Sequence, residues 1–328
     1  STRNSDATCI TDPSAAMLGW IDAQAERMLE RVVTLAEVNS GTTNRAGVER
    51  VVALVEPMLT ELADIVERVP LPPRVQVNDD GRSLSIASAD ALLATRRPNA
   101  SRRVLLNIHL DTVFGSDHPF QSVTRPDEHT LRGPGVADAK GGLIVMLTAL
   151  EAFERFAAPR NVGWQIVLNP DEEIGSPASV GLLQNAARDA DFGLVYEPAL
   201  PDGRLIRQRK GSGNFTVVVR GRSAHAGREI EKGRNAIAAL ARLFVDIEQL
   251  HAPDHGISLN LGRIVGGGPS NIVPDLAVGH FNARVLEHSN VESVEQRLTH
   301  LVESANEADG ITVELHGRFS SPPKMFDT

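Results

Sequence analysis

The chain has 328 residues, of which 41% are hydrophobic and 23% charged, and its 33 basic and 42 acidic residues give a net charge of -9. This is the composition of a globular protein long enough for two domains, and without a basic block it excludes nucleic acid and an anionic membrane as main partners. The single cysteine, Cys9, excludes an internal disulfide and a cysteine-based zinc site.

The sequence places few limits on the compartment. No apolar run approaches the roughly 20 residues that a membrane-spanning helix needs. Residues 1–13 are polar, lack the charged-then-apolar pattern of a signal peptide and do not start with methionine, so we expect that a leading segment has been removed. One cysteine suits the cytoplasm without requiring it, which leaves cytoplasm and periplasm open.

The first two thirds of the chain alternate between helical and strand patterns. Apolar residues at helical spacing predict helices over residues 18–35, 48–62, 140–156 and 179–188. Short, β-branched apolar runs predict buried strands over residues 104–110, 164–169 and 192–196. This alternation indicates an α/β sheet with helices on its faces.

From Gly213 the pattern changes. In chain order it predicts a strand over 214–220, a helix over 234–250, strands over 258–265 and 276–286, a helix over 291–308 and a strand over 311–316. The order β-α-β-β-α-β is a complete ferredoxin-like unit. We therefore predict one domain over residues 14–212 and a second, inserted domain over residues 213–318.

Histidine and carboxylate side chains follow the predicted strands. His109 and Asp111 end the first strand, residues 171–173 (Asp-Glu-Glu) follow the second, Glu197 follows the third, and Asp138 precedes the long helix. In an open α/β sheet, ligands bind outside the carboxyl ends of the strands. We predict that these side chains meet at one edge of the sheet.

The residue types at this edge suit a divalent metal. Imidazole nitrogen and carboxylate oxygen favour zinc, with cobalt or manganese as substitutes. Asp111 is two residues from His109, so it can face the same side and orient the imidazole. Glu172 and Glu173 point different ways, so one can bind metal while the other accepts a proton. Asp171 is also open to a structural interpretation, as an acid at a helix N-terminus.

Four motifs, HLDTV, GPGVADAKGG, DEEIGS and EPA, occur in this order within about residues 33–285. In order and spacing they resemble the metallopeptidase family of glutamate carboxypeptidase, acetylornithine deacetylase, succinyl-diaminopimelate desuccinylase and aminoacylase. The resemblance implies a mixed-sheet metallo-exopeptidase catalytic domain with an inserted lid and dimerisation domain. It implies two divalent metal ions: His109, Asp138 and Glu197 bind the first, and Asp138 bridges to a second held by Glu173.

The resemblance also implies roles beside the metals. Glu172 would be the general base, Asp111 would orient His109, and the peptide bond from Asp138 to Ala139 would be cis. The motif GRSAHAG places His225 where family members supply a histidine across a dimer interface to stabilise the oxyanion. The motif GGGPSNIVPD offers Asn271 as a substrate contact.

Two further motifs, FNARV and RKGSG, place Arg284 and Lys210 where glutamate-specific members bind substrate carboxylates. We therefore expect a zinc-dependent homodimer, paired through the inserted domain, that cleaves an amide next to a free carboxylate and releases a C-terminal amino acid from a small peptide. A deacylase of N-acyl amino acids and a non-catalytic relative that binds a metal or a carboxylate are the alternatives. Glu172, which no binding protein needs, favours an enzyme. His225, Asn271, Lys210 and Arg284 are each also compatible with ordinary surface residues.

The end of the chain departs from the resemblance. Family members return to the catalytic domain after the insert and add strands and a histidine for the second metal. Nothing after His316 matches that segment. We therefore expect a truncated chain, with a catalytically impaired relative as the other interpretation, in which only the first metal site has all its expected ligands.

Overall fold

The computed structural model describes residues 13–157, 159, 161–200, 202–204 and 206–325. Cys9 and most of the polar start of the chain lie outside these residues. The chain forms two compact units, the first made of Ser1–Arg74 and Ala87–Pro198, the second of Val75–Ile86 and Ala199–Thr328. The division predicted from the sequence, 14–212 and 213–318, stays a prediction; the second compact unit includes a short segment from early in the chain.

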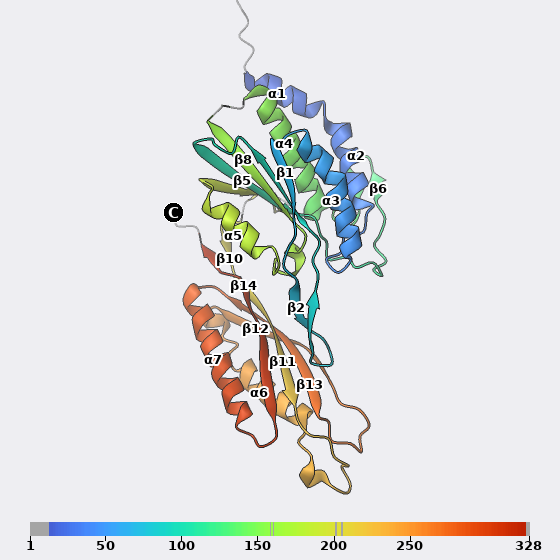
Figure 1. Cartoon of the computed structure of the whole chain (residues 1–328), viewed down its shortest axis with the longest axis vertical. Helices are drawn as coiled ribbons and strands as arrows, with labels where there is room; N and C mark the ends of the chain where they lie inside the picture. Colours follow the sequence, from blue (N-terminus) through green and yellow to red (C-terminus); the bar gives the residue numbers. More distant parts are fainter. Residues whose placement is uncertain (1–12, 158, 160, 201, 205, 326–328) are drawn as a thin grey trace, which may run out of the picture. The chain divides into compact units, whose positions relative to one another are not determined.

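The first unit is a mixed five-stranded sheet with helices on both faces (Figure 1). Its helices are α1 (Pro13–Asp22), α2 (Ala25–Ala36), α3 (Arg45–Thr60), α4 (Gly142–Phe156) and α5 (Val180–Arg188). The sheet has the order β1 (Ile65–Val69), β4 (Ala91–Arg96), β8 (Val162–Asn169), β5 (Arg102–His109), β9 (Phe192–Val195). Strands β8, β5 and β9 are parallel, and β1 and β4 add on antiparallel. A separate hairpin joins β6 (Thr124–Asp127) to β7 (Thr130–Arg132).

The central strands of this sheet are buried on both faces. Leu106 and Ile108 of β5 belong to the core that includes residues of α2, α3 and α4, whereas Leu105 packs with residues of β8 and α5 on the opposite face. Successive side chains of a strand point to opposite faces. Two-sided burial therefore explains why the strand sequences are almost continuously apolar.

The single helix predicted over residues 18–35 is wrong at its centre. The structure has two helices, α1 and α2, separated at Ala23 and Gln24. The backbone N–H of Gln24 donates to the oxygen of Ile21, and its side-chain Nε2 donates to the oxygen of Trp20 at 3.1 Å. These bonds form a turn, which the continuing apolar spacing concealed.

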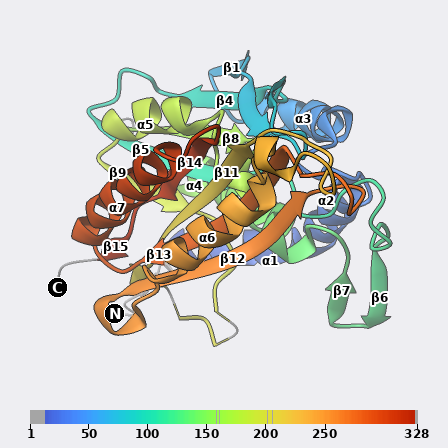
Figure 2. The same cartoon turned by 90° about the horizontal axis from the view of Figure 1, so that it is seen from below.

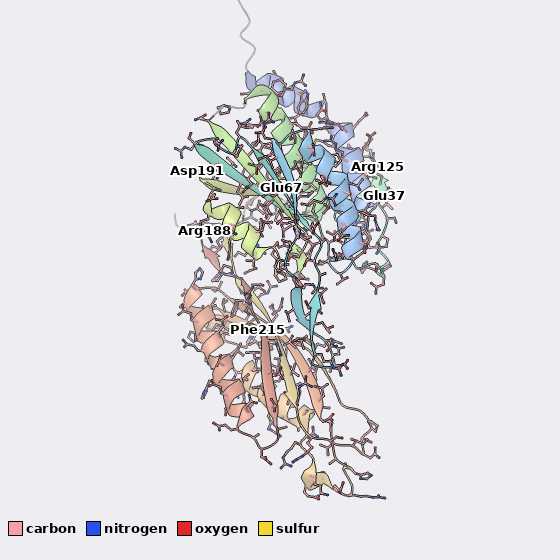
Figure 3. All side chains as sticks on the ribbon, viewed as in Figure 1. Glu37, Glu67, Arg125, Arg188, Asp191 and Phe215 are labelled. Carbon is pink, nitrogen blue, oxygen red and sulfur yellow. The ribbon has the colours of Figure 1, made fainter. Side chains whose placement is uncertain are left out.

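The second unit has the ferredoxin-like order predicted from the sequence, so the fold class is confirmed. Its elements in order are β11 (Gly211–Arg220), α6 (Ala236–Glu248), β12 (Ile257–Gly266), β13 (Leu276–Val285), α7 (His288–Asn306) and β14 (Thr312–Ser321). The antiparallel sheet has the order β12-β13-β11-β14. Both helices lie on one face of it (Figure 2). Phe215, labelled in Figure 3, stacks on Phe281 with ring centroids 5.1 Å apart in the core between sheet and helices.

The other face of this sheet is partly covered by the hairpin of β2 (Arg74–Val77) and β3 (Ser83–Ile86). Val77 packs against Val218 and Val278, and the guanidinium of Arg220 donates to the oxygen of Gly81 at 2.6 Å. Two short strands, β10 (Gln208–Arg209) and β15 (Lys324–Met325), pair with each other. Among the described residues, no helix combines the length and apolarity needed to cross a membrane.

Candidate functional site

Four side chains of the first unit lie where the predicted metal ligands were expected. His109 is the last residue of β5, Glu173 belongs to the turn η2 (Glu172–Ile174) that follows β8, and Glu197 comes just after β9. Asp138 lies in a π-helical turn, η1 (Val136–Gly141), which leads into α4. Because β5, β8 and β9 are parallel, their carboxyl ends share one edge of the sheet.

These side chains form a compact cluster. His109 Nε2 lies 2.9 Å from Asp138 Oδ1 and 3.7 Å from Glu197 Oε2. One ligand atom each from His109, Asp138 and Glu173 lies within 4.8 Å of the other two. The side chain of His109 is fully buried, whereas 56% of Asp138 and 36% of Glu197 are exposed. The cluster is therefore anchored in the core and open to solvent on one side.

Asp111 connects the imidazole to the two glutamates. Its buried carboxylate accepts hydrogen bonds from the backbone N–H of Glu172 at 3.1 Å, from that of Glu173 at 3.2 Å and from Thr42 Oγ1 at 2.6 Å. His109 Nδ1 lies 3.0 Å from the backbone oxygen of Asp111 and 3.3 Å from its carboxylate. Both oxygens are acceptors, so Nδ1 carries a proton and Nε2 is the atom that faces the cluster.

The charges of the cluster favour a bound cation. Burial alone would lower the pKa of His109, but the carboxylates of Asp111 and Glu197 raise it to about 11. Burial raises the pKa of Glu173 to about 7; His109 opposes the shift, and Asp138 and Asp111 add to it. Negative charge thus exceeds positive charge around one imidazole. Because imidazole nitrogen and carboxylate oxygen are also the donors that zinc and similar ions prefer, these residues fit a divalent metal.

The segment that carries Asp138 contains a cis peptide bond and a buried lysine. The peptide bond between Asp138 and Ala139 is cis, as the resemblance implied. Two residues later the fully buried Lys140 donates from Nζ to the backbone oxygen of Val38 at 3.3 Å. Burial lowers the pKa of Lys140 to about 8, opposed by the nearby Asp111. The contact ties the turn that carries Asp138 to the segment just after α2, a role that the sequence pattern did not indicate.

Asp171 has a structural role of its own. Its buried carboxylate accepts hydrogen bonds from the backbone N–H groups of Ala178 at 2.7 Å and Ser179 at 3.2 Å, and from Ser179 Oγ at 2.5 Å. It therefore closes the loop between η2 and α5 and lies at the N-terminus of that helix, as its second interpretation from the sequence proposed.

In the second unit, His225 and Asn271 lie on two loops that are hydrogen-bonded to each other. The N–H of Ala226 donates to the oxygen of Asn271 at 2.9 Å, and His225 forms a β-bridge with Ile272. His225 Nδ1 accepts a hydrogen bond from the N–H of Gly227 at 3.1 Å. In a neutral imidazole this places the proton on Nε2, which is then a hydrogen-bond donor.

Arg284 and Lys210 are exposed cations of the same unit. Arg284 Nε donates to Asn282 Oδ1 at 3.3 Å, and Asn282 Nδ2 in turn donates to Asn214 Oδ1 at 2.8 Å and to the oxygen of Gly213 at 3.0 Å. Neither Arg284 nor Lys210 forms an ion pair with any residue the structure describes. Their charges are thus accessible to a ligand.

The ten predicted site residues are therefore divided between the two units. The first unit contains the metal-ligand candidates and their neighbours, and the second contains the substrate-binding candidates. The first set is His109, Asp111, Asp138, Glu172, Glu173 and Glu197; the second is Lys210, His225, Asn271 and Arg284.

A mixed α/β unit with a histidine–carboxylate cluster at its strand ends, combined with a β-α-β-β-α-β unit, is characteristic of metal-dependent peptidases and amidohydrolases. Comparison with known proteins agrees. Residues 207–310 match the peptidase dimerisation domain of the M20 family. The chain is thus homologous to the M20 metallopeptidases and hydrolases and contains their dimerisation domain, which confirms the resemblance found in its motifs.

Individual relatives belong to several branches. The chain is 25% identical over 295 residues to carboxypeptidase G2 of Pseudomonas sp. (strain RS-16), covering 89% of this chain and 68% of that protein. It is 30% identical over 202 residues to succinyl-diaminopimelate desuccinylase of Nitrosospira multiformis, covering 57% and 52%. The crystal structure of the aminobenzoyl-glutamate utilization protein from Klebsiella pneumoniae shares the fold, with a TM-score of 0.71, 15% identity and coverage of 95% and 80%. The chain spans about half to two thirds of the length of the curated relatives it matches.

Proposed function

We propose that the protein is a metal-dependent hydrolase that cleaves an amide bond next to a free carboxylate. The substrate we favour is a small peptide from which a C-terminal glutamate is released. One observation carries the proposal: Glu172 and Glu173 share a turn that Asp111 holds beside His109, which joins a proton acceptor to a cluster of metal ligands.

The ligand roles follow the donors in the cluster. His109, Asp138 and Glu197 would hold one divalent ion, and Asp138 with Glu173 would hold a second. Zinc is our proposal for both, with cobalt or manganese as substitutes. A bound divalent ion supplies Lewis acidity toward water and toward a carbonyl oxygen. Asp111 keeps the proton of His109 on Nδ1, so that Nε2 is available as the ligand atom.

Glu172 would act as the general base. Its backbone N–H is bonded to Asp111 Oδ1, which fixes the start of the turn. The carboxylate takes a proton from the attacking water as the new C–O bond forms. It then gives that proton to the nitrogen as the C–N bond breaks, so the products are a carboxylate and a free amine.

The residues of the second unit would recognise the substrate. His225, with its proton on Nε2, can donate to the oxyanion that develops on the carbonyl. Arg284 would bind the free carboxylate, since a guanidinium matches a carboxylate with two parallel hydrogen bonds. Lys210 would add a second positive charge and Asn271 a polar contact. The dimerisation domain supports a homodimer formed through this unit.

Two other functions remain in competition. A deacylase of N-acyl amino acids is supported by the desuccinylase, which is 30% identical to this chain over 202 residues, whereas the carboxypeptidase is 25% identical over 295 residues. A non-catalytic relative would bind a metal or a carboxylate and would have no use for a base at Glu172.

The experiment is hydrolysis of N-acetyl-glutamate, a glutamate-terminated dipeptide and N-succinyl amines by the protein with added zinc, compared with Glu172→Gln. Release of glutamate from the dipeptide that disappears in Glu172→Gln is the expected result. Preferential cleavage of N-acetyl-glutamate or of the N-succinyl amines would establish the deacylase instead. A tightly bound metal without turnover of any of these compounds would establish the non-catalytic relative.

A further inference from the structure

The loop between α2 and α3, residues 37–44 (the α2–α3 loop), is bonded to the segment that follows His109. The N–H of Thr42 donates to the oxygen of Thr112 at 3.1 Å, and the N–H of Thr112 donates back to the loop at 2.9 Å. The hydroxyl of Thr42 also donates to Asp111 Oδ2 at 2.6 Å. The loop therefore holds the carboxylate that orients His109.

The same loop is bonded to the turn that carries Asp138. Lys140 is fully buried; its Nζ donates to the oxygen of Val38 at 3.3 Å, and its N–H donates to the oxygen of Gly135 at 2.8 Å. The lysine side chain packs over Gly135, where a Cβ would lie 3.1 Å from Lys140 Cδ and 2.9 Å from Thr112 Cγ2. The turn, the α2–α3 loop and the segment of Thr112 therefore meet at one place.

The α2–α3 loop also has supports of its own. Asn39 Nδ2 donates to the oxygen of Phe114 at 3.0 Å and to Gln121 Oε1 at 2.8 Å, and Asn39 Oδ1 accepts from the N–H of Gly41 at 3.2 Å. Asn44, the N-cap residue of α3, donates from Nδ2 to the oxygen of Asn39 at 3.1 Å. None of these contacts involves a candidate metal ligand. The loop can therefore act as a fixed reference for both sides of the cluster.

Packing alone does not explain the buried lysine. Among the described residues, the Val38 oxygen is the one acceptor hydrogen-bonded to its ammonium, and moving a poorly paired ammonium out of water is unfavourable. Methionine, of similar length, would fill the space without that penalty. The lysine adds a donor that reaches from the Asp138 turn to Val38. Valine would likewise fill the space of Thr42, but it could not donate to Asp111.

We propose that Thr42 and Lys140 are positioning residues of the metal cluster, each acting through the α2–α3 loop. Thr42 holds Asp111 and through it His109, whereas Lys140 holds the turn of Asp138. Together they set the spacing between the two sides of the cluster before a metal binds, so that the ligands need little rearrangement. The inference rests on the proposed function, in which His109 and Asp138 bind the same ion.

The test measures two quantities on the full chain: zinc affinity, by competition with a chelator, and the free energy of unfolding of the metal-free chain, by urea denaturation. Lys140→Met and Thr42→Val should each lower zinc affinity about tenfold, the lower end of the range for residues that support a ligand. Thr42→Ser keeps the hydroxyl and should restore wild-type affinity. The metal-free stability of Lys140→Met should be unchanged or higher, because the substitution removes a buried ammonium.

The double variant tests whether the two residues act through one spacing. Because loss of either contact releases that spacing, Thr42→Val combined with Lys140→Met should bind zinc about as weakly as either single variant. Thr34→Val is the matched control for the threonine, since its hydroxyl also donates a hydrogen bond, to the oxygen of Glu30 in α2. Lys232→Met, at an exposed lysine of the second unit, is the control for the lysine.

The outcomes separate the inference from the function on which it rests. If the variants of Thr42 and Lys140 bind zinc as tightly as their controls, or if their effects multiply in the double variant, the inference is wrong. A metal-free chain destabilised by Lys140→Met would show a structural role and would also overturn it. Should Lys140→Met not fold, Thr42→Val and Thr42→Ser decide alone. If zinc binding survives His109→Ala, or the wild-type chain binds no zinc, the proposed metal site itself is wrong.

Discussion

The candidate sites of the two units are built in opposite ways. In the first unit, His109 and Asp111 are buried, and the carboxylate of Asp111 accepts three hydrogen bonds from two separate parts of the chain, Thr42 and the turn of Glu172 and Glu173. In the second unit, Arg284 and His225 are exposed, and each side chain is held by a single hydrogen bond.

The difference follows from what each site must hold. A metal ion bonds its ligands at about 2 Å and tolerates little displacement, so the ligands need support from a buried second layer. A substrate must enter from solvent, and a guanidinium can adjust to it with its own torsions. Substitutions should therefore disturb chemistry and metal binding strongly in the first unit and substrate affinity weakly in the second.

The largest expected effect is that of Glu172→Gln. Loss of the proton acceptor should lower kcat by about a thousandfold, because general base catalysis contributes factors of this size. Metal content should stay at the wild-type value, since the backbone N–H of residue 172 still bonds to Asp111. Steady-state kinetics and elemental analysis measure the two quantities, with the exposed Glu61→Gln as control. Full activity in Glu172→Gln would mean that another group takes the proton.

Asp111→Asn should have the next largest effect. An amide can accept with only one of its two atoms, so one of the two glutamate N–H groups loses its acceptor and His109 loses its charged neighbour. Metal affinity should fall about 10- to 100-fold, the range for residues that support a ligand. Competition with a chelator measures this. An unchanged affinity would show that the imidazole needs no help from Asp111.

Asp171→Asn is the matched comparison within the same unit. Asp171 is also buried and accepts three hydrogen bonds, but its partners, Ala178 and Ser179, belong to the loop before α5. The substitution should lower the free energy of unfolding by about 2 kcal/mol, because a buried donor loses its charged acceptor. Urea denaturation measures the loss, and metal affinity should change less than threefold. A loss of metal affinity as large as that of Asp111→Asn would remove the distinction between the two aspartates.

Much of the fold could be predicted from local pattern, and the exceptions have physical causes. Strands β5 and β8 were predicted because both faces of their central residues are buried, which makes their sequences largely apolar. Strand β1 has Glu67 and Arg68 at its centre, and β4 is rich in alanine and leucine, so neither has a strand signal of its own. They pair with each other and β4 with β8, which only the folded sheet reveals.

The candidate site residues could likewise be predicted only where the local sequence locates them. The metal-ligand candidates follow strand ends that can be located in the sequence, whereas the polar neighbours of Arg284, such as Ser212 and Asn282, depend on pairing between distant strands. The last strand was predicted to stop at residue 316. In the structure Gly317 has φ +101 and a Cβ there would lie 2.1 Å from the oxygen of Asn214, so glycine lets β14 continue to Ser321.

The smallest expected effect is that of Asn282→Ala, and it tests the comparison most closely. Removing Asn282 frees Arg284 Nε but leaves the guanidinium on the same strand, so KM for a carboxylate substrate should rise about threefold with kcat unchanged. Asn282→Asp should raise KM further, because its charge competes with the substrate for Arg284. Asn260→Ala, which pairs with Asn282 from the neighbouring strand β12, is the control. If Asn282→Ala instead raises KM by as large a factor as Asp111→Asn lowers metal affinity, the orientation of Arg284 is as tightly determined as that of His109. Exposed site residues would then be no more tolerant of substitution than buried ones.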